Sequence, residues 1–76
     1  MPTLFEIGSL RIRLYAGDHN PPHFHVVTSD GEALVRIADM TMLRGSIRRR
    51  DLETALEWAR GNRRLLDDEW RRLNGE

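Results

Sequence analysis

Hydrophobic and polar residues alternate along the first half of the chain. In residues 10–15 every even position is apolar, and residues 23–28 and 32–37 continue the alternation. Side chains of a strand point alternately to its two faces, so each segment is predicted to be a half-buried strand. A shorter, weaker pattern at residues 41–43 predicts a further strand.

Turn-forming residues separate these segments. Gly8-Ser9 follows the short apolar segment 4–7, and Ser29-Asp30-Gly31 lies between the next two strands. Short turns of this composition are typical of β-hairpins. Residues 16–22 contain Gly, Asp, Asn and two Pro, which predicts a longer loop.

The last third of the chain has a helical period. Its apolar positions recur every three or four residues: Leu52, Ala55, Leu56 and Ala59, followed by Leu66, Trp70 and Leu73. This spacing predicts two amphipathic helices, the first capped by Ser46 and ended by Gly61, the second capped by Asn62. One kinked helix is the alternative.

Strands followed by helices predict an α+β fold. We expect a small antiparallel sheet of three to four strands, built from hairpins, with both C-terminal helices packed on one face. A chain of 76 residues has room for a single domain, 1–76, with strands in 1–45 and helices in 46–74.

The amino-acid composition limits the kinds of functional site that the chain can form. The chain contains no cysteine, which excludes disulfides, thiolate metal sites and cysteine nucleophiles. Twelve basic residues, all arginine, balance twelve acidic ones, so no long-range attraction to nucleic acid or anionic lipid is implied. We see no membrane span and no signal peptide, and we expect a cytoplasmic protein without membrane partners.

All three histidines, His19, His23 and His25, lie in the segment Asp18–His25. Alternation places His23 and His25 on the polar side of their strand. The polar sides of the neighbouring strands carry the other candidate binding residues, Arg11, Arg13, Tyr15 and Arg36. If the strands pair, imidazoles and guanidinium groups share the sheet face that the helices leave open.

This shared face leads to our first functional hypothesis, a binding module rather than an enzyme. Guanidinium forks and imidazoles on rigid strands suit the phosphate or carboxylate oxygens of an anionic partner, either protein or nucleic acid. An ordinary solvated sheet face is the alternative interpretation, since an antiparallel sheet can leave one side in water.

A second hypothesis is a metal site. His23 and His25 can direct two nitrogens at one ion, and His19 can complete a set for Zn or another divalent metal, with Asp18 as a ligand or as its supporting partner. The nearby arginines argue against a cation. A structural role, with each imidazole bonded to backbone carbonyls, is the alternative.

A third hypothesis is a metal-free, ribonuclease-like toxin. Two adjacent histidines can supply an acid and a base, and an arginine can stabilise an anionic transition state. No nucleophile stands out, however, and the pattern does not predict an enzyme. The thin core also leaves homodimerisation open, because periodicity cannot separate a dimer face from a core face.

Three features together resemble one family. They are Met1-Pro2-Thr3, the motif Asp-His-x-Pro-Pro-His-Phe-His-Val at 18–26, and Glu57-Trp58 followed by a helix containing Trp70. They resemble the domain-of-unknown-function 4160 family of short bacterial proteins. The resemblance implies a stand-alone bacterial cytoplasmic protein, often encoded beside a second small protein, an arrangement that suggests one component of a toxin and antitoxin-like pair. The chain departs from the family's usual pattern at Leu34, where a lysine is common.

Overall fold

A computed structural model describes residues 3–19 and 21–75. The strands are β1 (Thr3–Ile7), β2 (Leu10–Arg13), β3 (His23–Thr28), β4 (Gly31–Arg36) and β5 (Met42–Ser46). They are followed by the helices α1 (Arg49–Gly61) and α2 (Arg63–Asn74). Met1 and Pro2 of the family resemblance lie outside the described residues, as does Asn20 of the histidine segment.

The sheet is antiparallel throughout, and its strands follow one another in chain order from β1 to β5. The predicted α+β class and the two C-terminal helices are confirmed. Within residues 3–19 and 21–75 the sheet has five strands rather than three or four, because both short outer segments pair with their neighbours. The first hairpin turns at Gly8, whose φ of +59° lies in the left-handed region that favours glycine.

Alternation predicted the core correctly. Ile12, Phe24 and Val35 are completely buried, whereas Arg11 and Arg13 between the core positions of β2 remain partly exposed. The helices contribute the buried residues Ala55, Ala59, Leu66 and Trp70. Burying one large apolar side chain contributes roughly 1.5–3 kcal/mol, so this single layer of contacts carries most of the stability.

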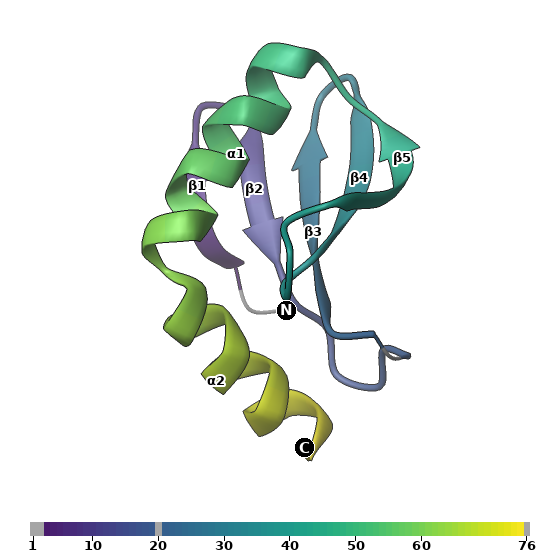
Figure 1. The fold of residues 1–76 in the computed structure, drawn as a ribbon. Helices are drawn as coiled ribbons and strands as arrows, with labels where there is room; N and C mark the ends of the chain where they lie inside the picture. Colours follow the sequence, from purple (N-terminus) through teal and green to yellow (C-terminus); the bar gives the residue numbers. More distant parts are fainter. Residues whose placement is uncertain (1–2, 20, 76) are drawn as a thin grey trace.

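The two helices lie over different parts of the sheet. In Figure 1, α1 lies across the sheet, and α2 continues past the end where β2 stops and β3 starts. The helices are separate rather than one kinked helix, with α1 ending at Gly61 as predicted. Asn62 precedes α2, but its Nδ2 donates to Trp58 O of α1 (2.9 Å). Ser46 is not the cap of α1. It is the last residue of β5, and the cap position is Arg48.

The pairing of β5 with β4 contains an irregularity. Its register with β4 shifts between Leu34 and Val35. At Gly45 the backbone adopts a φ of +112°, and a Cβ added there would collide with the backbone of Glu32. Glycine is therefore required where β5 passes β4 at such close range.

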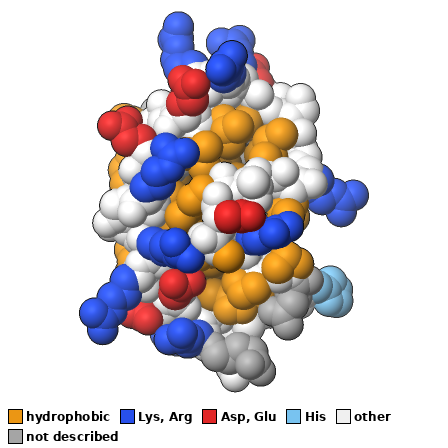
Figure 2. Space-filling view, in the orientation of Figure 1, with side chains coloured by type: hydrophobic (Ala, Val, Ile, Leu, Met, Phe, Trp, Pro, Cys, Tyr) orange, Lys and Arg blue, Asp and Glu red, His pale blue; other side chains and the backbone are white. Residues whose placement is uncertain are grey.

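The face seen in Figure 2 has hydrophobic side chains near its centre, with arginines and acidic residues around them. Exposed large hydrophobic residues include Ile7, Met42 and Leu65. No helix among residues 3–19 and 21–75 combines the length and apolar composition needed to cross a membrane.

Candidate metal centre

Two imidazoles and one carboxylate converge at the start of β3. The Nε2 atom of His25 lies 3.0 Å from Asp18 Oδ2, and the Nε2 atom of His23 lies 3.3 Å from the same oxygen. The alternation of β3 brings both rings to one side of the strand, and the loop after β2 brings Asp18 to them. The three side chains form a group that could hold a metal ion, with ligand atoms within 4.8 Å of one another.

The other nitrogen of each ring is fixed by an oxygen. His23 Nδ1 lies 2.9 Å from the carbonyl oxygen of Pro21, and His25 Nδ1 lies 2.8 Å from Glu32 Oε2. A carbonyl and a carboxylate only accept hydrogen bonds, so each Nδ1 carries the hydrogen and donates it. A neutral ring then has its lone pair on Nε2, which is the atom directed at Asp18.

This arrangement leaves a local excess of acceptors. With both rings neutral, two Nε2 lone pairs and the carboxylate of Asp18 meet without a hydrogen between them. A proton or a cation must lie among them, because acceptors in contact repel one another. Ligand atoms around one tetrahedral zinc ion lie roughly 3.3–3.5 Å apart, given metal bonds of about 2.0–2.1 Å. The two nitrogen-to-oxygen distances are close to this spacing.

The histidines are enclosed, and the expected open face is wrong at this point. The side chains of His23 and His25 are only 8% and 13% exposed. The His23 ring lies 5.4 Å from the Trp70 ring of α2, and the His25 ring meets the edge of Tyr15 at 4.5 Å. Strand periodicity predicts which side chains share a face, but it cannot show that a distant helix and a loop cover part of that face.

A cavity of about 260 Å³ adjoins the three converging side chains. Its walls are formed by Asp18, His19, Pro21, His23, His25, Leu34, Leu43 and Arg44. His19 is exposed on this wall and does not belong to the converging group. The converging group is therefore Asp18, His23 and His25 rather than the predicted His19, His23 and His25, because the loop directs the carboxylate of Asp18 inward.

The predicted arginines share the face but do not converge on the histidines. Strand pairing sets Arg13 opposite His25 and Arg36 opposite His23. Arg11 Nη2 pairs with Glu6 Oε2 (3.1 Å), and Arg36 Nη1 pairs with Asp39 Oδ2 (3.4 Å).

Arg13 Nε donates to Thr3 Oγ1 (3.2 Å). The ion pairs of Arg11 and Arg36 weaken the expected repulsion of a cation, whereas the bond from Arg13 to a neutral hydroxyl leaves its charge uncompensated.

Sequence reasoning missed two residues of the centre. Glu32 holds the His25 ring from β4, and Trp70 closes the site from α2. Glu32 occupies an alternating polar position with no motif around it, so no local signal distinguishes it from a solvated residue. Trp70 was predicted as a core residue, which it also is.

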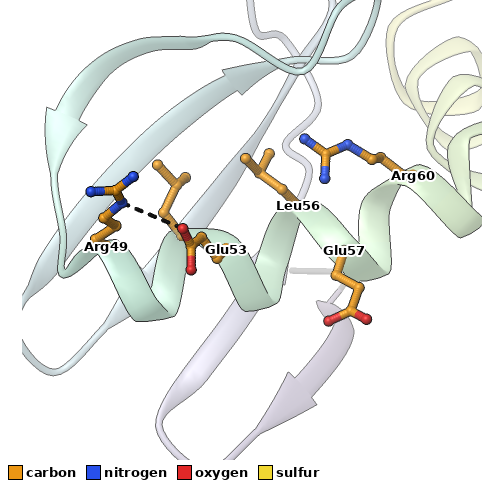
Figure 3. Close-up of a pocket in the computed structure, with 6 residues that line it drawn as sticks. Arg49, Glu53, Leu56, Glu57 and Arg60 are labelled. Carbon is orange, nitrogen blue, oxygen red and sulfur yellow. Dashed lines mark ion pairs between the residues drawn. The ribbon is translucent and has the colours of Figure 1, made fainter.

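A second hollow, of about 600 Å³, lies along α1. Figure 3 shows the residues that line it, with Arg49 Nε paired to Glu53 Oε2 at 3.4 Å. Both partners are mostly exposed, and such pairs contribute little to stability. The residues that line this hollow include no histidine, so the chemistry of the described residues is concentrated at the start of β3.

Residues 9–71 match the family model described as a domain of unknown function, DUF4160. The chain belongs to the DUF4160 family. The match covers most of the chain, including every strand except β1 and the whole candidate centre, and it confirms the predicted resemblance. No curated protein and no solved structure matches this DUF4160 domain.

Proposed function

We propose that this DUF4160 domain binds one divalent transition-metal ion, such as Zn²⁺, through Asp18, His23 and His25. The observation that carries the proposal is the orientation of the two rings. Each Nδ1 donates to an oxygen, so in a neutral ring each Nε2 directs its lone pair toward Asp18 Oδ2, where a bound cation would satisfy all three groups. Metal-binding histidines are typically oriented in this way by a carbonyl or carboxylate on the opposite nitrogen.

The ligand types favour a metal of the zinc class. Two imidazoles and one carboxylate suit Zn²⁺ and other late first-row divalent ions, whereas Ca²⁺ and Mg²⁺ prefer oxygen alone. Three protein ligands also leave a coordination position free, as in catalytic and exchangeable zinc sites rather than in closed structural ones. The adjoining cavity gives that free position access to a small molecule.

The local charges support a cation. Asp18 and Glu32 contribute two negative charges beside the histidines, and Arg11 and Arg36 are paired with acids of their own. Arg13 bonds instead to the hydroxyl of Thr3, and Arg44 lies two strands away from His25 on β5. The same pairing makes an anionic partner on the arginine face a weaker interpretation, and that hypothesis stays a prediction. The ribonuclease-like hypothesis and the toxin and antitoxin-like pairing also stay predictions.

Metal titration tests the proposal. Protein purified without a histidine tag is stripped with a chelator and titrated with Zn²⁺ by calorimetry, with an expected stoichiometry of one ion per chain. His25→Ala and Asp18→Asn each remove one of three ligands. We expect each to weaken binding by more than about 100-fold, which exceeds the usual cost of losing a supporting partner.

His19→Ala is the matched control, because it removes a nearby exposed imidazole outside the proposed ligand set. We expect it to retain one tightly bound ion. Circular dichroism of each apo variant checks that the fold persists. A wild-type protein that binds no Zn²⁺, or Asp18→Asn and His25→Ala proteins that bind it as tightly as the wild type, would refute the proposal.

A further inference from the structure

The wall of the cavity beside the metal group contains one arginine, Arg44. It lies on β5 opposite Leu34, which in turn lies opposite His25 on β3. Cross-strand partners point to the same face of a sheet, so these residues form a row leading from the histidines to the outer strand. Both ends of the row line the same cavity of about 260 Å³.

The irregularity in β5 turns two consecutive side chains toward this cavity. Leu34 pairs with Arg44, but the next residue of β4, Val35, pairs with Met42, so β5 contains one extra residue, Leu43. Neighbouring side chains of a regular strand point to opposite faces, whereas Leu43 and Arg44 both line the cavity. Such bulges commonly redirect a side chain near a functional site.

Arg44 differs in its pairing from two other arginines on this face, Arg11 and Arg36. Arg11 and Arg36 form ion pairs, but among residues 3–19 and 21–75 no acidic side chain lies within 4.0 Å of the Arg44 guanidinium. A divalent ion would offset the charges of Asp18 and Glu32. Arg44 would then contribute an uncompensated positive charge to the cavity wall, which favours a monoanion.

Building on the proposed metal site, we infer that the cavity binds a small organic monocarboxylate. One carboxylate oxygen takes the free position on the metal, and the other accepts a hydrogen bond from Arg44. Guanidinium and carboxylate are matched for such contacts. The hydrocarbon part lies against Leu34 and Leu43, which with Pro21 form the apolar part of the wall. Pockets for drug-sized ligands are roughly 300–1,000 Å³, so a ligand of a few carbons fits this smaller cavity.

Cobalt substitution provides the test. Co²⁺ occupies sites of the zinc type, and its visible absorption changes when an exogenous ligand joins its coordination shell. The Co²⁺-loaded protein is titrated separately with butyrate, with uncharged butyramide and with inorganic phosphate. We expect a saturable spectral change with butyrate, none with butyramide, and a weaker response to phosphate, whose dianion matches the cavity charge less well.

Arg44→Gln and Arg44→Lys separate the contribution of the guanidinium group to butyrate binding from that of the metal. We expect both variants to bind Co²⁺ like the wild type, Arg44→Gln to weaken butyrate binding at least tenfold, and Arg44→Lys to weaken it less. Arg50→Gln is the matched control, since it removes the same charge from an exposed position of α1 that does not line the cavity. It should bind butyrate normally.

The outcomes distinguish this inference from the proposed function. A protein that binds no Co²⁺ refutes both. A protein that binds Co²⁺ but does not respond to butyrate refutes only the carboxylate inference, as does an Arg44→Gln variant that binds butyrate with unchanged affinity. Phosphate binding as tight as butyrate binding overturns the choice of an organic monocarboxylate.

Discussion

Asn74 at the end of α2 accepts a hydrogen bond of 2.8 Å from the backbone N–H of Gly17, although the two residues are 57 positions apart. Gly17 directly precedes Asp18, so the last residue of the second helix supports the loop that supplies the carboxylate of the metal group. The same helix places Trp70 against His23. The candidate centre therefore depends on the C-terminal helix as well as on the sheet.

Because Asn74 supports the loop that contains Asp18, we expect a substitution at Asn74 to change the Zn²⁺ affinity. Asn74→Ala should weaken Zn²⁺ binding roughly twofold to tenfold, because a hydrogen bond of this kind contributes about 0.5–1.5 kcal/mol. Asn74→Asp keeps an oxygen acceptor for Gly17 and should retain more of the affinity. Competition titration against a zinc indicator measures both. An Asn74→Ala protein with wild-type affinity would show that the loop holds Asp18 without this contact.

Glu32 is expected to act through His25 rather than on the metal directly. Glu32→Gln replaces the charged acceptor of His25 Nδ1 by a neutral amide, which should lower Zn²⁺ affinity about 10- to 100-fold while leaving one site per chain. Glu53→Gln removes an equal charge from an exposed position of α1 and serves as the control. If both substitutions lower the affinity equally, general charge rather than ring orientation is responsible.

Two adjacent leucines of α2 should differ sharply in their effect on stability. Leu66 is completely buried in the core, whereas Leu65 is 42% exposed. Leu66→Ala should lower the free energy of unfolding by about 2–5 kcal/mol, because it removes buried apolar contacts and leaves a cavity. Leu65→Ala should change it by less than about 0.5 kcal/mol. Urea denaturation measures both, and similar losses would mean that α2 packs through a different face.

Two surface carboxyl groups should titrate below their ordinary range. A hydrogen bond from the Thr41 side chain is the main cause that lowers the pKa of Asp39 from 3.8, and a hydrogen bond from Arg72 lowers that of Glu69 from 4.5. Each ionised carboxylate stabilises the fold above its unfolded pKa. That contribution is lost as the pH falls through the lowered folded pKa.

Carboxyl ¹³C chemical shifts measured against pH test this directly. Thr41→Val removes the hydroxyl and should move the Asp39 midpoint up toward 3.8 without affecting Glu69. An unchanged Asp39 midpoint in Thr41→Val would assign the lowered pKa to Arg36 and the backbone instead.

Local patterns predicted much of the fold. Strand β3 begins and ends at the predicted residues, α1 ends at the predicted glycine, and the buried apolar positions of β2, β3 and β4 follow the alternation, with His23 buried on the opposite, polar side. These features depend on the two-residue period of a strand, the 3.6-residue period of a helix and the conformational preferences of turn residues. Each of them is a property of a few consecutive residues.

The centre itself was predicted only in part. The phase of β3 correctly placed His23 and His25 on one face, since parity is local. It could not select Asp18 over His19 as their companion, because both lie in a loop without a period. Nor could it indicate Glu32 as the partner of His25, a contact that requires the register between β3 and β4.

The amino-acid order alone therefore determined the elements, their buried faces and the shared direction of two imidazoles. Packing between distant segments determined that Trp70 and the loop enclose those imidazoles, that Asp18 meets them, and that the β5 bulge turns Arg44 toward the same cavity. The physical reason is the distance along the chain over which each kind of interaction acts. Backbone geometry repeats over a few residues, whereas the position of a loop or helix against a sheet depends on contacts between residues far apart in the chain.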